Sequence, residues 1–434
     1  MKFCRIAVGG ILVLCMCGAC AIAQATAPQM DSANSLFKAG KFAEAGKIYA
    51  QIAAKNPKDN YATQQLGYIA LLSNQLDDAQ KWLQKAIALK PDNASAKIML
   101  AEVFYRRDDF ENAAAILNQI GPSYASMIKN YPTLIAPKLE SFKGLTPYQL
   151  HGHGDATTLP FIKSEPLPVV NVRVNGSTEV TFFIDTGGSE LLLDTDFGHE
   201  LGVMPMGSSQ GTFSGGQKAE VLSGKVDSVT LGDWTLYNVP VAMLPLRQLS
   251  AGFGVKHLDG CIGTNVLYHF LATLDYPHGK LVLRKKTAKN LKDFEKINAG
   301  KTVAVPIWIA SDHFMVAWGQ INSTPPALLF IDTGLAGAGV KLGESMLKAA
   351  DIKLEEDKAS EGAGGGGKLR TVPYVVQKVS LGAIQEENVA GLYDGPFPWE
   401  NSFGFYLAGM VGHDFFKPYA VTFDFQNMRV LLQK

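Results

Sequence analysis

Two aspartates stand in the same short sequence at two distant places in the chain. The tripeptides are Asp185-Thr186-Gly187 and, 147 positions further on, Asp332-Thr333-Gly334. A carboxyl group can act as a base when it is ionised and as an acid when it is protonated. Two carboxylates held about 3 Å apart cannot both ionise, so they share one proton. If Asp185 and Asp332 meet in space, this repeat predicts a site that activates water.

Each tripeptide follows an apolar run, residues 181–184 before Asp185 and residues 328–331 before Asp332. Such a run predicts a buried strand that ends at the carboxylate, and the glycine allows a sharp turn. In the first copy Asn175-Gly176 separates two strand-like runs, which indicates a hairpin leading into Asp185.

The similarity of the two copies continues downstream. Gly260-Cys261-Ile262-Gly263 corresponds to Gly409-Met410-Val411-Gly412, and each is followed by a similar pair of strand-like segments. The spacing between the aspartate and the later glycine is nearly the same in the two copies, from Asp185 to Gly263 in the first and from Asp332 to Gly412 in the second. One fold written twice is therefore expected, with one lobe at 165–290 and the other at 300–434.

This region resembles the aspartic (acid) protease family, in a bilobal form with compact lobes like those of retroviral proteases and their bacterial relatives. The resemblance implies that Ile262-Gly263 and Val411-Gly412 cross behind the two aspartate loops. It implies that Thr186 and Thr333 hydrogen-bond across the lobes, and that Gly187 and Gly334 donate N–H groups to the carboxylates. It implies an endopeptidase that needs neither metal nor cofactor, in which Asp185 and Asp332 activate the water that attacks a peptide bond.

Each lobe also has a Gly-rich stretch between its aspartate and its later glycine. The first contains Gly211, Phe213 and Gly215, and the second contains Gly364 and Gly365. Two lids over the site are expected here, because a lid excludes water and orients substrate. The alternative is that both stretches are only mobile surface loops.

The sequence departs from the family pattern directly after each tripeptide. Gly188 and Leu335 stand where a hydroxyl residue or alanine is usual. A hydroxyl would bond a carboxylate oxygen and help to keep it ionised. The alternative function is therefore a catalytically silent protein that binds peptides with a protease-like fold.

The first 25 residues have the pattern of a signal peptide. Lys2 and Arg5 precede a nearly uncharged apolar stretch, and small residues follow. Export to the periplasm or medium is expected, with lipidation at Cys20 or an uncleaved anchor as alternatives. Only Cys261 remains in the mature chain, and a buried apolar role is expected for it.

Residues 26–123 repeat with a period of 34. Ala45, Ala79 and Ala113 follow this spacing, as do Phe42, Leu76 and Phe110. The pattern resembles tetratricopeptide (TPR) repeats, about three units of paired helices. These units are interpreted either as a surface for a protein partner or peptide, or as a spacer or cap.

A linker is expected at 124–164, where prolines and glycines recur. His151 and His153 flank a glycine there without further ligands nearby, so no metal site is expected. The basic and acidic residues are equal in number, 40 of each, which argues against nucleic acid as a partner. The expected fold is multidomain, an all-α TPR region followed by an all-β bilobal acid-protease fold.

Overall fold

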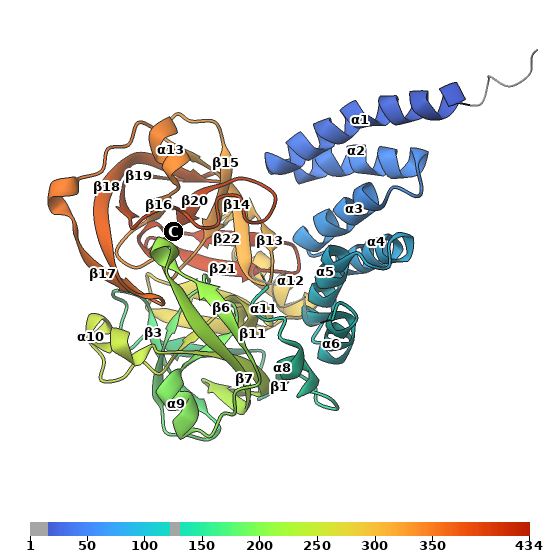
Figure 1. Cartoon of the computed structure of the whole chain (residues 1–434). Helices are drawn as coiled ribbons and strands as arrows, with labels where there is room; N and C mark the ends of the chain where they lie inside the picture. Colours follow the sequence, from blue (N-terminus) through green and yellow to red (C-terminus); the bar gives the residue numbers. More distant parts are fainter. Residues whose placement is uncertain (1–15, 122–130) are drawn as a thin grey trace, which may run out of the picture.

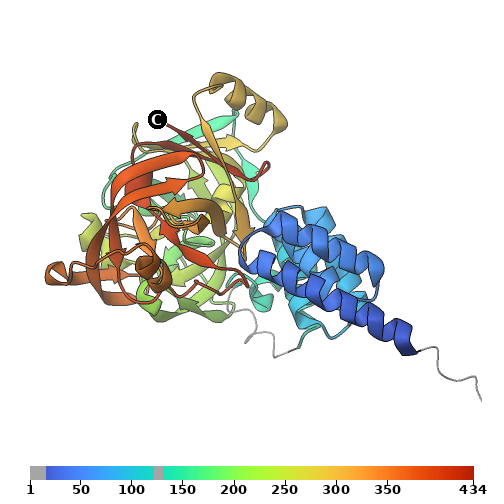
Figure 2. The same cartoon turned by 90° about the horizontal axis from the view of Figure 1, so that it is seen from above.

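The computed structural model describes residues 16–121 and 131–434, without the side chains of residues 16–26. The expected signal peptide (1–25) and the lipidation candidate Cys20 therefore lie outside the residues whose side chains are described. Within the described part of the chain, no helix is both long and apolar enough to span a bilayer. A stack of helices stands beside a β-rich body, and both views show the two parts in contact (Figures 1 and 2).

The N-terminal region consists of three antiparallel helix pairs. The pairs are formed by α1 (Met16–Lys38), α2 (Phe42–Lys55), α3 (Asn60–Leu72), α4 (Leu76–Leu89), α5 (Ala94–Tyr105) and α6 (Phe110–Asn118). The repeated small residues Ala45, Ala79 and Ala113 are fully buried, which lets paired helices approach closely. Asp59 and Asn93 cap α3 and α5 with side-chain hydrogen bonds. The predicted helical repeat is confirmed.

The segment expected to be a linker contains regular structure. It holds α8 (Ala136–Glu140), β1 (Gln149–His151) and β2 (Ala156–Pro160). β1 pairs with β8 (Trp234–Leu244), and β2 pairs with β11 (Lys280–Lys285). The β-rich region therefore begins near residue 149, before the predicted lobe boundary at 165.

Two eight-stranded sheets share one topology. The first has the order β1-β8-β5-β9-β4-β3-β7-β6, and the second has the order β13-β14-β15-β20-β16-β19-β18-β17. From β3 onward the strands of the first sheet are β3 (Val169–Val174), β4 (Val180–Ile184), β5 (Leu191–Asp194), β6 (Ser208–Thr212), β7 (Lys218–Leu231) and β9 (Gly260–Ile262). Those of the second are β13 (Trp308–Ala310), β14 (Phe314–Ile321), β15 (Ala327–Ile331), β16 (Val340–Leu342), β17 (Ser360–Gly364), β18 (Gly367–Leu381), β19 (Ile384–Tyr393) and β20 (Leu407–Val411). Each strand of one sheet, apart from β1 and β13, has an equivalent in the other. The equivalent strands are β3 and β14, β4 and β15, β9 and β20, β5 and β16, β8 and β19, β7 and β18, and β6 and β17. The predicted all-α then all-β layout is confirmed.

A third sheet joins the lobes. Its order is β12-β22-β21-β10-β11-β2, and β10 of lobe one pairs with β21 of lobe two. The remaining bounds are β10 (Phe270–Asp275), β12 (Val303–Pro306), β21 (Ala420–Asp424) and β22 (Arg429–Gln433). The hydroxyls of Thr273 and Thr422 meet at 2.8 Å where the lobes join. The sheet is thus a shared floor for the two copies.

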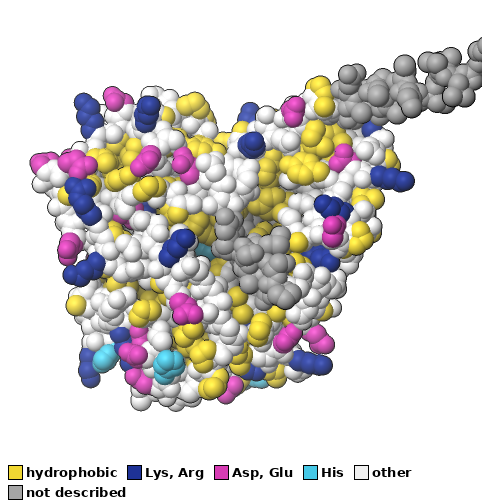
Figure 3. Space-filling view, viewed as in Figure 1, with side chains coloured by type: hydrophobic (Ala, Val, Ile, Leu, Met, Phe, Trp, Pro, Cys, Tyr) yellow, Lys and Arg dark blue, Asp and Glu magenta, His cyan; other side chains and the backbone are white. Residues whose placement is uncertain are grey.

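Shorter helices complete the β-rich region. They are α9 (Thr195–Glu200), α10 (Ser250–Phe253), α11 (Thr264–Tyr268), α12 (Ala288–Ile297), α13 (Glu344–Ala349) and α14 (His413–Phe416). On the face shown in Figure 3, basic and acidic side chains are interspersed and form no patch of one sign. This pattern agrees with the equal numbers of the two kinds of residue.

Candidate active site

Asp185 and Asp332 occupy equivalent positions at the ends of central strands. β4 runs parallel to β9, and the Asp185 N–H donates to the Ile262 carbonyl at 3.1 Å. β15 runs parallel to β20, and the Asp332 N–H donates to the Val411 carbonyl at 3.0 Å. The apolar runs that precede each aspartate are buried, as the sequence predicts. The strands therefore bring both carboxylates to the junction of the lobes.

The two threonines lock the aspartate loops together. The Thr186 N–H donates to Oγ1 of Thr333 at 3.0 Å, and the Thr333 N–H donates to Oγ1 of Thr186 at 3.0 Å. The Thr186 hydroxyl in turn donates to the Ile331 carbonyl at 2.9 Å. Both threonines are fully buried. These contacts run between the lobes, so they fix the separation of the two loops.

The glycines allow the carboxylates to meet. A Cβ on Gly187 would lie 2.5 Å from Oδ1 of Asp332, and one on Gly334 would lie 2.1 Å from Oδ1 of Asp185. The Gly187 N–H donates to Oδ1 of Asp185 at 2.6 Å, and the Gly334 N–H donates to Oδ1 of Asp332 at 2.9 Å. The two carboxyl groups lie close enough for each to influence the pKa of the other. Any side chain at either glycine would displace the opposite carboxylate.

Burial raises the pKa of both carboxyl groups. For Asp332 burial is the largest cause, and the neighbouring Asp185 charge raises the pKa further, well above its ordinary value. Burial also raises the pKa of Asp185, although the interaction with Asp332 and the hydrogen bond from the Gly187 N–H lower it in part. Held side by side, the two carboxyl groups share one proton. The pair titrates as one unit.

Gly188 and Leu335, which depart from the family pattern, have different surroundings. A Cβ at Gly188 would have ordinary contacts, with the Cys261 sulfur at 3.8 Å. Leu335 is buried and packs against Gly412 in an apolar cluster that lobe two shares with the helical repeats. Neither residue supplies a hydroxyl to the pair. Cys261 is buried, as expected, and burial raises the pKa of its thiol.

Both Gly-rich stretches form the tips of hairpins. β6 pairs with β7 around Phe213 and Gly215, and β17 pairs with β18 around Gly364 and Gly365. The tips touch: a Cβ on Gly365 would lie 2.6 Å from the Phe213 ring. Gln217 also donates to the Lys368 carbonyl at 3.1 Å. Figure 1 shows the green and orange hairpins approaching one another from the two lobes.

The first hairpin also reaches the walls beside the carboxylates. Phe213 packs against an apolar cluster that contains Phe183 and Cys261, and Ala336 from the second aspartate loop packs against the same cluster. A Cβ on Gly215 would lie 2.9 Å from the Asp394 carbonyl of lobe two. Gly211 lies on the β6 side of this hairpin. The structure therefore gathers the predicted lid residues between the lobes.

The sequence analysis missed a buried ion pair in lobe two. Lys341 and Asp394 form an ion pair, with side chains only 1% and 4% exposed. Lys341 lies opposite Met410 in the β16–β20 pairing, where lobe one has Leu192 opposite Cys261. The positive charge of Lys341 opposes the rise in the pKa of Asp332. The feature of the sequence that could have indicated this ion pair is the lysine inside the otherwise apolar strand β16.

Three histidines lie outside the carboxylate pair. His269 contacts Asp108 at 3.1 Å and His278 contacts Asp275 at 2.8 Å. His413 is buried beside Glu165 and Asp414, and these three residues could offer ligand atoms within 4.8 Å of one another. The Lys417 ammonium already binds both acids, at 2.8 and 2.6 Å. A resident positive charge there disfavours a metal ion.

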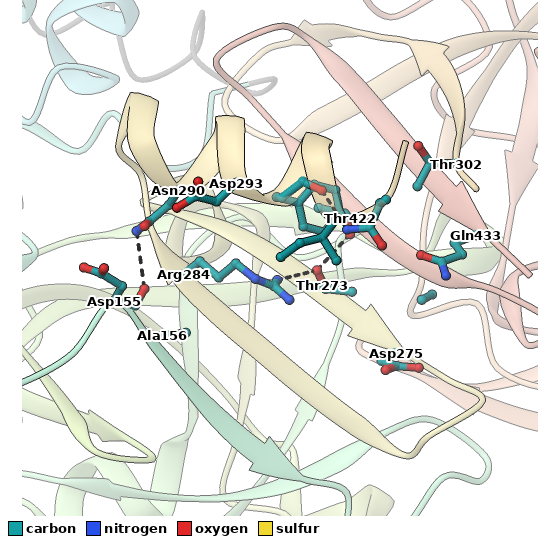
Figure 4. Close-up of a pocket in the computed structure, with 14 residues that line it drawn as sticks. Asp155, Ala156, Thr273, Asp275, Arg284, Asn290, Asp293, Thr302, Thr422 and Gln433 are labelled. Carbon is teal, nitrogen blue, oxygen red and sulfur yellow. Dashed lines mark hydrogen bonds between the residues drawn. The ribbon is translucent and has the colours of Figure 1, made fainter. Parts of the chain in front are cut away.

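A cavity of about 290 Å³ lies between α12 and the shared sheet (Figure 4). Arg284 reaches into it and donates to the Thr273 hydroxyl at 2.8 Å. Asn290 of α12 donates to the Asp155 carbonyl at 3.4 Å. None of its lining residues belongs to the aspartate loops or the hairpins. This cavity is therefore separate from the candidate active site.

Comparison with known proteins matches both regions of the chain. Residues 170–266 match the aspartyl protease family model. Residues 30–94 and 70–127 each match a tetratricopeptide repeat model. The predicted aspartyl-protease region preceded by TPR repeats is thus confirmed. The protease match includes Asp185, whereas Asp332 lies beyond it.

No curated protein matches the chain. Among solved structures, a mutant O-GlcNAc transferase from Thermobaculum terrenum is 18% identical, with a TM-score of 0.24. The overlap covers 27% of this chain and 25% of that one. The chain thus spans about a quarter of that protein's length, and so slight a likeness supports no inference about function.

Proposed function

We propose that this protein is an aspartic endopeptidase in which Asp185 and Asp332 activate water against a peptide bond. The proposal rests on one observation above all: reciprocal hydrogen bonds between Thr186 and Thr333 hold the Asp185 and Asp332 carboxyl groups side by side. The glycine beside each aspartate leaves no space for a side chain at the opposite carboxylate. A paired carboxylate of this kind supplies an acid and a base at one place. The TPR repeats would serve interaction with a protein partner or the substrate.

In the proposed reaction Asp185 acts as the base and Asp332 as the acid. Asp185 is ionised and takes a proton from the water, whose oxygen then forms a bond with the carbonyl carbon. Asp332 carries the shared proton and gives it to the carbonyl oxygen, which leaves a tetrahedral diol. The proton on Asp185 then passes to the amide nitrogen, the C–N bond breaks, and a diol proton returns to Asp332. Every step uses only water and these two side chains.

Peptide cleavage tests the proposal. The purified wild type would be assayed against a mixed peptide library between about pH 3 and pH 8, beside Asp185→Asn and Asp332→Asn. Each substitution is expected to lower kcat by at least about 1000-fold, because acid and base catalysis both need the carboxyl group. Asp357→Asn, on the exposed surface, is the matched control and should behave as wild type. Cleavage that persists in either dyad variant contradicts the assignment.

A catalytically silent, peptide-binding protein is the second candidate. The absence of a hydroxyl at Gly188 and at Leu335 favours it, because such a group helps to keep a carboxylate ionised. Peptide binding without cleavage, in the wild type and in all the variants above, would support this candidate.

The proposal also includes export of the protein from the cytoplasm. The test compares where the full-length protein and a variant without residues 1–25 accumulate in a bacterial host. If the full-length protein stays in the cytoplasm as the shortened variant does, export is contradicted.

A further inference from the structure

Lobe one contains a buried carboxylate in the same loop as Asp185, and the proposed reaction does not use it. Glu190, five residues after Asp185, is 1% exposed. The Lys138 ammonium binds both of its oxygens, at 2.7 and 2.8 Å, and is itself fully buried. The Tyr105 hydroxyl donates to Glu190 at 2.5 Å. Lys138 belongs to α8 and Tyr105 ends α5, so both partners come from outside the repeated lobe.

Glu190 ends the same short loop that carries Asp185. Within this loop the Gly188 and Ser189 carbonyls accept from the N–H groups of Thr264 and Asn265, at 2.9 and 2.7 Å. Thr264 also donates its hydroxyl to the Thr186 carbonyl at 2.8 Å. The loop is therefore held at one end by the threonine contacts and at the other by α5 and α8.

The residue after Tyr105 reaches the other lobe. Arg106 donates to the Ile309 carbonyl at 3.2 Å and to the Ser311 carbonyl. The Ile309 carbonyl belongs to β13, and the Ser311 carbonyl belongs to the turn before β14, which also carries His313. His313 acts against the rise in the pKa of Asp185. Two consecutive residues of the third helical repeat thus hold structures on both sides of the carboxylate pair.

The arrangement has no counterpart in lobe two. Gly339 occupies the position equivalent to Glu190, because Leu191 pairs with Ile262 as Val340 pairs with Val411. A Cβ on Gly339 would lie 2.6 Å from the Val389 side chain and 3.0 Å from the Phe415 nitrogen. A side chain is excluded there. Glu190 is therefore specific to lobe one.

We propose that Glu190, Lys138 and Tyr105 are positioning residues through which α5 of the third helical repeat, together with α8, holds the Asp185 carboxylate against Asp332. The repeats are then a working part of the proposed enzyme as well as an interaction module. Loss of the Lys138 charge leaves Glu190 buried without its counter-ion, so the loop must shift to reach water. A misplacement of about 1 Å at a reacting group can lower a rate by about 100-fold. The inference rests on the proposed function.

The test compares Lys138→Met and Tyr105→Phe with wild type in the full chain. Lys138→Met is expected to lower kcat about 10- to 100-fold with KM changed less than about twofold, and to shift the pH profile. Tyr105→Phe loses one hydroxyl and keeps the ring stacked on Phe110, so it should fold normally and lose about three- to tenfold in kcat. Arg173→Met removes an exposed ion pair of the same lobe and should leave both constants unchanged.

Hydrogen–deuterium exchange gives a reading that does not depend on cleavage. Both Lys138→Met and Tyr105→Phe should speed exchange in residues 183–190 and leave residues 369–381 of β18 unchanged. A fall in melting temperature with unaltered kcat, pH profile and loop exchange would overturn the positioning role. If the wild type cleaves nothing, the proposed function fails, and the exchange measurement still decides whether α5 and α8 hold the Asp185 loop.

Discussion

At the residue scale, the surroundings that suit Asp332 for the proposed chemistry also lower the stability of the folded protein at neutral pH. It is a carboxyl group placed against another carboxyl group and shielded from water, and both conditions raise its pKa. The unfolded chain has no such restraint, and its aspartates ionise near a pKa of about 3.9. Below that pKa the folded and unfolded states bind the proton alike. As pH rises toward the folded pKa, the unfolded state ionises first, so stability falls.

Asp332→Asn should therefore stabilise the protein at pH 7 and have little effect at pH 4. The amide is close in size to the carboxyl group and never ionises. A gain of about 2–4 °C in Tm is expected at pH 7, the shift that about 1 kcal/mol produces in a domain the size of one lobe. Thermal melts at the two pH values measure it, with exposed Asp357→Asn as the control. An equal effect at both pH values would contradict the assigned pKa direction.

At the element scale, the repeated pattern predicted the strands and turns that position the pair. An apolar run that ends in Asp-Thr-Gly is a local signal, and both runs form buried strands. β2 lacked such a signal, because its partner β11 lies about 120 residues away and its five residues alternate between exposed and buried. The Lys341–Asp394 pair was missed for a similar reason. Lys341 lies on β16 and Asp394 directly follows β19, and only the fold reveals that these two strands pair.

The hairpin tips illustrate how the fold gives two neighbouring glycines different roles. A Cβ on Gly365 would lie 2.6 Å from the Phe213 ring, whereas the nearest atom to a Cβ on Gly364 is 3.7 Å away. Gly365→Ala should therefore separate the tips, and Gly364→Ala should disturb them less. For peptide cleavage we expect KM to rise about three- to tenfold in Gly365→Ala, because lid closure contributes to substrate binding. Steady-state kinetics of both variants measure the difference. Equal KM values in the two variants would argue against contact between the tips in solution.

At the scale of the whole molecule, the helical repeats and the lobes share one apolar core. Phe37 and Phe42 of the first repeat pack on Phe405 of lobe two, with ring centroids 6.1 and 5.0 Å apart. Tyr68 of the second repeat donates to the Phe403 carbonyl at 3.1 Å. The sequence favoured separate units joined by a linker. Phe42 fits the pattern of the repeat itself, so nothing in the sequence marks it as part of an interface.

Because Phe405 is 1% exposed and sits between the two helices and lobe two, Phe405→Ala should uncouple the repeats from the lobes. Loss of a buried phenylalanine costs about 3–5 kcal/mol. Phe416→Ala is the matched control, since Phe416 is fully buried in lobe two and makes an edge-to-face contact with Phe415. Both variants should lose stability to a similar degree. Hydrogen exchange should then show α1–α3 opening before the lobes in Phe405→Ala only. If the helices and lobes of that variant still open together, the shared core is held by contacts other than this aromatic cluster.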